Sequence, residues 1–155
     1  MAESWYVRNG AVAGLVSGVV TAIIVYATLP SPEAVIEEVE RRGMLGVGEV
    51  SVEYISLALK LSGVIVAIII TLLGVVFGGL HEYLDSKFKM GSPYTAVMAG
   101  LAFTGLLVIP NLLFGGDASK IATNAFSGIV YTVVLALLAK YWRGPDNLKY
   151  ASERY

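Results

Sequence analysis

The sequence predicts an all-α integral membrane protein, a bundle of four transmembrane helices with a short amphipathic helix in the first loop. The first observation is composition: 56% of the 155 residues are hydrophobic and 15% are charged, whereas a soluble domain has about 25% charged residues. The second is the stretch Leu61 to Leu80, which contains no ionisable side chain. As a helix it is about 30 Å long, the thickness of a bilayer's hydrocarbon core.

The composition also limits the function. The chain has no cysteine, which excludes disulfides, thiolate metal sites and cysteine catalysis. Its net charge of -1 gives no basic face for a nucleic-acid partner. One histidine and the absence of HExxH, GxSxG and phosphate-loop motifs predict that the chain is not an enzyme and has no cofactor.

Four spans form a single membrane domain over 1–155. They are expected at about 10–29, 55–83, 93–114 and 118–141, and a polar carboxyl-terminal tail is expected over 142–155. The first nine residues are expected to form a polar tail, with Trp5 and Tyr6 at the membrane interface. The first span is expected to be retained, because its flank lacks the basic region and cleavage site of a signal peptide. Pro110 should kink or end the third span, since it removes a helical hydrogen bond.

The first loop contains the expected amphipathic helix, over 32–42. Ser31 is a good cap for its start, Pro32 suits the first helical position, and Gly43 suits the end. The second span is expected to belong to a longer helix, from near Ser51 to near Lys87, which exceeds the thickness of a bilayer.

The distribution of basic residues predicts orientation. Four spans place both termini on one side, which carries 7 of the Lys and Arg residues, and the other side carries 4. The positive-inside rule therefore predicts a multi-pass protein of the cell membrane with both termini in the cytoplasm. The loop with six glutamates between 33 and 53 then faces outside.

Glycines recur at helical spacing. Gly10, Gly14 and Gly18 are four residues apart, so they share a helix face that another backbone can approach closely in lipid. That face is expected to pack within the chain or, alternatively, against a second copy. The glycines expected at helix contacts are Gly10, Gly14, Gly18, Gly74, Gly78 and Gly100.

Polar residues interrupt the first half of the fourth span. Lys120, Asn124 and Ser127 are spaced by four and three residues and share one helix face, and Asn111 precedes them near the same end. Polar residues in a span usually face the bundle interior or a water-filled cavity. These four residues are candidates for a polar path. The alternative is that they only hold the helices together by hydrogen bonds.

The end of the second span contains the histidine. His81 and Asp85 are four residues apart and share a face with each other, and Glu82 lies beside them. Such a group could exchange a proton or contribute to a metal site completed by other helices. The alternative is a solvated helix end. The middle of the bilayer contains no ionisable residue, which argues against a pump with a carboxylate at midplane.

Several features occur in an order that resembles a known family. They are the first span (GAVAGLVSGVV), the acidic segment PEAVIEEVE, a second span ending in Gly78-Gly79, and the third span AVMAGLAFTGLLVIPNLLF. Over about 10–117 the chain resembles CbtA-type predicted cobalt transporter subunits, which implies a role in transport. That family has one more span and additional histidines, so the resemblance implies no metal ligands here.

The expected function is that of a transporter or channel component. A bundle this small has little room for a substrate path of its own, so one chain is not expected to transport alone. It would act as an oligomer or with partner subunits in the lipid bilayer. Its path would lead from Asn111 and the polar strip toward His81 and Glu82. The alternative is a non-transporting structural or assembly subunit of a larger membrane complex.

Overall fold

The computed structural model describes residues 5–43 and 51–142, and these residues form helices without strands. The helices are α1 (Trp5–Thr28), α2 (Pro32–Arg41), α3 (Val52–Phe88), α4 (Ser92–Leu113) and α5 (Ala118–Tyr141). All except α2 are long and apolar enough to cross a membrane. The predicted all-α bundle with four spans and a short helix in the first loop is therefore confirmed. The tail expected over 142–155 lies outside the described residues, apart from Trp142.

The predicted caps delimit α2 and α3. The Ser31 hydroxyl accepts the Ala34 backbone N–H at 3.2 Å, and Gly43 ends α2 with a φ of 65°. The Ser51 hydroxyl accepts the Tyr54 N–H at 3.4 Å. Helix α3 then continues for 37 residues, about 55 Å, which is longer than a bilayer is thick.

One expected boundary needs correction. Helix α1 begins at Trp5 and not at Gly10, so the expected polar tail is helical from Trp5 onward. This start is stabilised by packing, since Asn9 is buried and the Tyr6 hydroxyl bonds to α3. Pro110 lies within α4, which ends three residues later. The Phe114 N–H closes that last turn on the Pro110 carbonyl at 2.9 Å.

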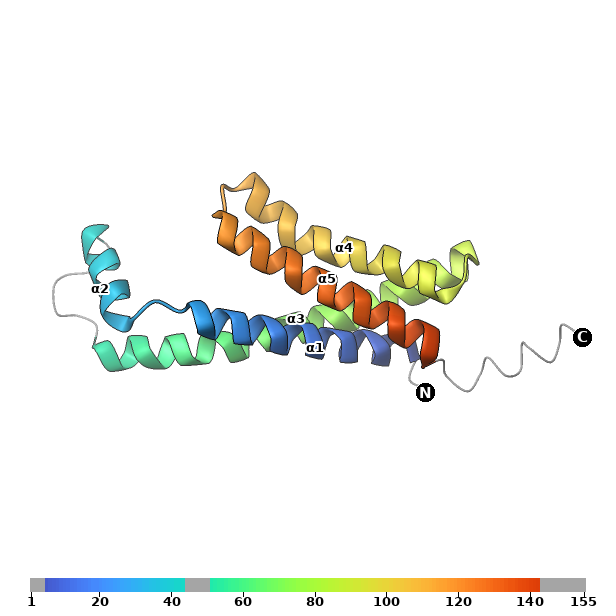
Figure 1. Cartoon of the computed structure of the whole chain (residues 1–155), viewed down its shortest axis with the longest axis horizontal. Coiled ribbons are helices and arrows are strands. Elements are labelled where there is room, and N and C mark those ends of the chain that lie inside the picture. Colours follow the sequence, from blue (N-terminus) through green and yellow to red (C-terminus); the bar gives the residue numbers. More distant parts are fainter. Residues whose placement is uncertain (1–4, 44–50, 143–155) are drawn as a thin grey trace, which may run out of the picture.

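The spans pair into two hairpins, α1 with α3 and α4 with α5 (Figure 1). Backbones touch where the glycines of α1 and α3 meet. A Cβ on Gly74 would lie 2.7 Å from the Gly14 Cα, and one on Gly78 would lie 2.6 Å from the Tyr6 carbonyl oxygen. Likewise a Cβ on Gly18 would lie 2.7 Å from the carbonyl oxygen of Ala67. The glycine face of α1 is thus occupied by α3 of the same chain.

In the α4–α5 hairpin, a glycine of each helix packs against a threonine of the other. Gly100 faces Thr132, and Gly128 faces Thr104; in each case an added Cβ would lie 2.7 Å from the threonine Cβ. Each threonine hydroxyl donates to the carbonyl of the glycine four residues before it in its own helix, at 2.9 and 2.8 Å. The threonines therefore fill the space beside the glycines and leave no hydroxyl hydrogen unpaired in lipid.

Hydrogen bonds between helices occur at two levels along the bundle, and these levels mark the two ends of the spans. At one level the Tyr26 hydroxyl donates to the Lys60 carbonyl oxygen. At the other, Tyr6 bonds to Asp85, and His81 bonds to Ser92. About 20 residues separate the two levels along α1 and along α3, or about 30 Å, which matches the hydrocarbon core. We call these levels the α2 end and the His81 end; α2 lies against the part of α3 that extends beyond the α2 end.

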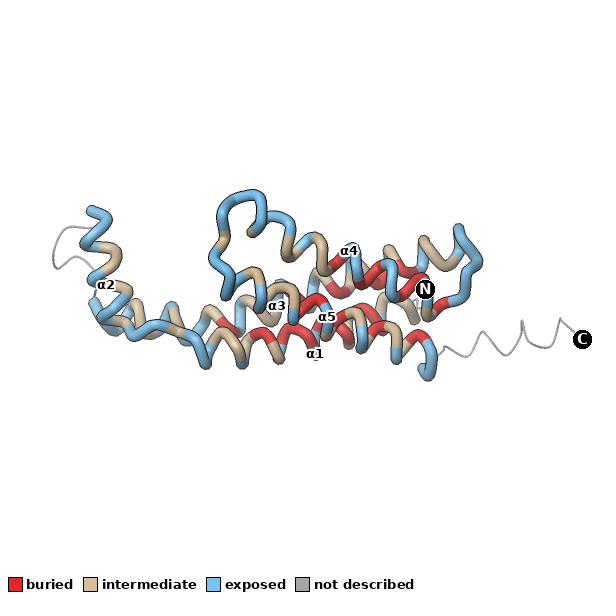
Figure 2. The backbone as a smooth tube through the Cα atoms, turned by 45° about the horizontal axis from the view of Figure 1, so that its top comes forward, coloured by how far each residue is buried: buried red, intermediate tan, exposed pale blue. Residues whose placement is uncertain are grey.

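Buried residues lie mainly toward the His81 end of the bundle (Figure 2). Phe103 stacks on Tyr131 with ring centroids 4.0 Å apart, and Phe77 meets Phe103 edge-on at 5.3 Å. Toward the α2 end the two hairpins diverge (Figure 1), and no residue from 104 to 124 is buried. The hairpins are therefore joined over about half their length.

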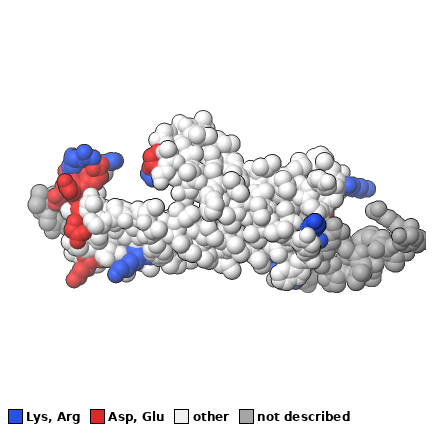
Figure 3. Space-filling view, viewed as in Figure 1, with Lys and Arg blue, Asp and Glu red and all other residues white. Residues whose placement is uncertain are grey.

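Charged side chains gather at the two ends, and the middle of the visible surface is uncharged (Figure 3). At the α2 end, acidic residues prevail around α2, where Glu38 pairs with both Arg41 and Arg42. The hydrogen bonds from these two arginines hold the pKa of Glu38 below its usual range, with Arg42 the larger cause. The uncharged middle is the part that a bilayer would cover.

Candidate functional site

His81 is fully buried at the boundary between the two hairpins, although it lies near the end of a span. Its Nε2 lies 2.9 Å from the Ser92 carbonyl oxygen and 3.2 Å from the Ser92 hydroxyl. The rings of Tyr6 and Trp5 meet the imidazole edge-on at 4.9 and 6.0 Å. The solvated helix end, one of the two alternatives from the sequence, does not describe this histidine.

Asp85 lies one turn further along α3 and connects three helices. One carboxylate oxygen accepts the Tyr6 hydroxyl of α1 at 2.6 Å, and the other accepts the Thr95 hydroxyl of α4 at 3.1 Å. The structure thus brings His81 and Asp85 together, as their spacing suggested. Glu82, the neighbour of His81 along α3, is exposed. We call Tyr6, His81, Asp85, Ser92 and Thr95 the His81 cluster.

One ring nitrogen of His81 has no hydrogen-bond partner in this cluster. Within the described residues, no group of three or more His, Cys, Asp or Glu side chains could hold a metal ion. An Nε2–H that donates to the Ser92 carbonyl leaves Nδ1 with a lone pair, and Nδ1 is buried without a hydrogen-bond partner. That lone pair can accept a proton.

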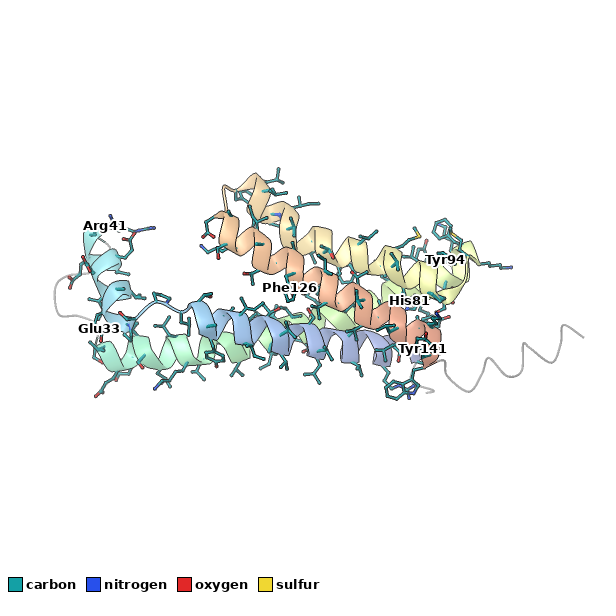
Figure 4. The ribbon with its side chains drawn as sticks, viewed as in Figure 1. Glu33, Arg41, His81, Tyr94, Phe126 and Tyr141 are labelled. Carbon is teal, nitrogen blue, oxygen red and sulfur yellow. The ribbon has the colours of Figure 1, made fainter. Side chains whose placement is uncertain are left out.

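Asn9 links α1 to the end of α5 at the same end of the bundle. Its side chain is buried, and its amide donates to the Trp142 carbonyl oxygen at 3.4 Å. Its own side-chain oxygen has no hydrogen-bond partner. Beside it, the Arg8 guanidinium lies 5.1 Å from the Trp142 ring centroid. Hydrogen bonds therefore tie all four spans together at the His81 end, where Figure 4 shows His81, Tyr94 and Tyr141.

The four candidates for a polar path do not form one line. The side-chain amides of Asn111 and Asn124 both donate to the Leu107 carbonyl oxygen, at 2.9 and 3.1 Å. Ser127 lies deeper, and its hydroxyl is 2.8 Å from that of Ser17 on α1. Lys120 is exposed at the tip of the α4–α5 hairpin and pairs with Asp117 at 3.1 Å.

Apolar packing separates these groups from the His81 cluster. Phe103 and Tyr131 are fully buried and stacked, and the Tyr131 hydroxyl donates to the Gly74 carbonyl oxygen at 3.2 Å. Leu135, also fully buried, continues this packing toward the His81 end. Within one chain, the expected path from Asn111 to His81 is interrupted by this core.

Comparison of the chain with family models, with curated proteins and with solved structures finds no match.

Sequence reasoning missed most partners of the site. Residues 9, 13, 17 and 21 form a stripe next to the glycine face of α1, and all four are buried. Ser17 and Thr21 are polar residues in an apolar span, a signal that they face protein rather than lipid. The sequence contained that signal, but it did not identify α5 as the partner.

Lowering the pH should open the first turn of α5. The Asp117 carboxylate caps that turn by accepting the Lys120 backbone N–H at 2.8 Å. This bond, and then the bond to the Lys120 side chain, lower the pKa of Asp117 from 3.8. The cap therefore acts fully above pH 3.8 and is lost as the pH falls through the lowered pKa. Hydrogen-exchange protection in this turn should fall accordingly.

Asp117→Asn is the control, because an amide oxygen also caps a helix but does not titrate in this range. A loss of protection that is equally steep in this variant would show that the carboxylate is not the titrating group.

Proposed function

We propose that this chain is a component of a membrane transport system that acts as an oligomer or with partner subunits, and that its two hairpins are the moving parts. One observation carries the proposal. Each hairpin is held together by close contacts of small residues, whereas the two hairpins meet through polar bonds and a buried core from the His81 end to the middle of the bundle, and diverge at the α2 end.

The two kinds of contact differ in how easily they change. Backbone contact at glycines leaves no side chain that can rearrange, so each hairpin moves as one body. A hydrogen bond between membrane helices contributes only about 0.6 to 2 kcal/mol. A few such bonds can be exchanged by binding of a substrate. Rocking of two rigid bodies about a shared contact is a common transport mechanism.

The His81 cluster is the closed gate in this proposal. Its bonds from α3 to α4, together with Asn9 and Trp142 between α1 and α5, close the bundle at one end. The positive-inside rule assigns that end to the cytoplasm. Asn111 and Asn124 lie in the diverging half and are candidates to line the open side, whereas Lys120 is not. The resemblance to cobalt transporter subunits supports transport in general, but no metal ligands follow from it.

A disulfide between the hairpins should stop transport. Since the chain has no cysteine, Ser17→Cys with Ser127→Cys introduces a single pair at positions whose hydroxyls are 2.8 Å apart. The complex as purified from its native membrane is reconstituted into liposomes with entrapped dyes for protons, potassium ions and divalent metal ions. Oxidation should lower the flux at least tenfold, and a reductant should restore it.

The two single cysteine variants are the controls and should keep their flux under oxidation. Flux that is unchanged by the locked pair would show that the hairpins do not move relative to each other. A complex that carries none of these ions faster than empty liposomes would contradict the transport proposal itself.

A second candidate is a non-transporting assembly subunit, which the dry aromatic packing of Phe103 and Tyr131 favours. This candidate predicts fixed partners in mild detergent and no flux. The mass of the native detergent complex separates a homo-oligomer from a subunit of something larger.

A further inference from the structure

A shallow apolar groove runs along the outer surface of the α4–α5 hairpin. Its volume is about 350 Å³. Residues of both helices line it, among them Tyr94, Val97, Val133, Ala136, Leu137 and Lys140. It lies apart from the His81 cluster and from the residues that join the hairpins.

The groove begins at the membrane interface and descends into the hydrocarbon. Lys140 is the residue before the end of α5, and Tyr94 lies in the first turn of α4. Figure 4 shows Tyr94 at this end of the bundle, together with Tyr141, the neighbour of Lys140. From Lys140 to Val133 the helix descends about 10 Å. The groove therefore has a polar mouth and an apolar interior.

Local packing explains the hollow. Gly100 lets α5 approach α4 at Thr132, whose hydroxyl donates to the Gly128 carbonyl. Ala136 has a short side chain and does not fill the space one turn further on. An elongated apolar chain fits such a surface.

The charge at the mouth selects the head group. Lys140 is exposed and forms none of the ion pairs found among residues 5–43 and 51–142; its Nζ lies 5.0 Å from the Tyr141 ring centroid. Basic residues outnumber acidic ones at this end of the described chain. They are Arg8, Lys87, Lys89 and Lys140, against Glu82 and Asp85. Asp85 already accepts two hydroxyl groups. The mouth therefore suits an anionic group.

We propose that this groove binds one anionic phospholipid. An acyl chain lies against Val97, Val133 and Ala136, and the phosphate is held by the Lys140 ammonium and the Tyr94 hydroxyl. Basic residues near a membrane surface attract anionic lipids, and the groove provides a defined binding position for the acyl chain. The site stands whether or not the protein transports anything.

Lipid binding is measured on the full chain in detergent, by native mass spectrometry with phosphatidylglycerol or phosphatidylcholine of identical acyl chains. The wild type should bind one phosphatidylglycerol more tightly than phosphatidylcholine. Lys140→Gln should weaken phosphatidylglycerol binding about fivefold and phosphatidylcholine binding less, because the choline ammonium already offsets the charge of its phosphate. Ala136→Phe, which fills the groove, should weaken both.

Lys87→Gln is the matched control, because it removes the same charge at the same end from α3. An equal effect of Lys87→Gln and Lys140→Gln would overturn the site in favour of diffuse attraction. Unchanged lipid binding in Ala136→Phe would overturn the groove as the seat of the acyl chain. A protein dimer that Ala136→Phe dissociates without loss of lipid would assign the groove to a second copy of the chain instead.

Discussion

Gly74→Val is expected to separate α1 from α3 and to lower the free energy of unfolding by about 3 kcal/mol or more. A Cβ at this position would lie 2.7 Å from the Gly14 Cα and 3.1 Å from the Gly14 nitrogen. These are backbone atoms, so no side chain can turn aside to make room. The measurement is unfolding of the purified protein in mixed micelles as the fraction of dodecyl sulfate is raised.

Gly79→Val is the matched control on the same helix. No atom lies within 4 Å of a Cβ built at Gly79, so the same substitution should change stability by no more than about 0.5 kcal/mol. Equal losses in the two variants would show that a valine on α3 is costly for a reason other than the close approach to Gly14.

His81→Ala should have the second large effect, a loss of about 2 to 4 kcal/mol. The ring is fully buried, so its removal leaves a cavity beneath Trp5 and Tyr6. The variant also loses the hydrogen bond of 2.9 Å to the Ser92 carbonyl oxygen, one of the few bonds between the hairpins. The same micelle titration measures the loss.

His81→Gln distinguishes the two contributions, because a glutamine amide can still donate to the Ser92 carbonyl. We expect it to recover part of the loss. Glu82→Gln, at the exposed neighbouring position, should leave stability nearly unchanged. An unaltered stability in His81→Ala would contradict the role of His81 in joining α3 to α4.

The spans and caps could be predicted because they depend on nearby residues. Ser31 and Ser51 cap the helices that follow them, and the apolar length of each span is set by the bilayer rather than by the fold. The start of α1 could not be predicted in this way. Its residues Tyr6 and Asn9 bond to Asp85 and Trp142, which lie far along the chain.

The site was predicted only where its members share a helix. The spacing of His81 and Asp85 placed them on one face, but it did not identify Ser92 and Thr95 opposite them. The same limit explains Lys120. It shares a face with Asn124, but its end of α5 lies where the hairpins have diverged, so that face meets solvent and Asp117 instead of another helix.

The uninterrupted length of α3 has a mechanical consequence. The helix contains no proline, and it connects α2, which we call the acidic platform, to the imidazole of His81 as one continuous helix. About 44 Å of this helix lie between Val52 and His81. A tilt of about 5° at His81 would therefore swing the platform sideways by about 4 Å. A partner that binds α2 would therefore act on the His81 cluster through a long lever arm.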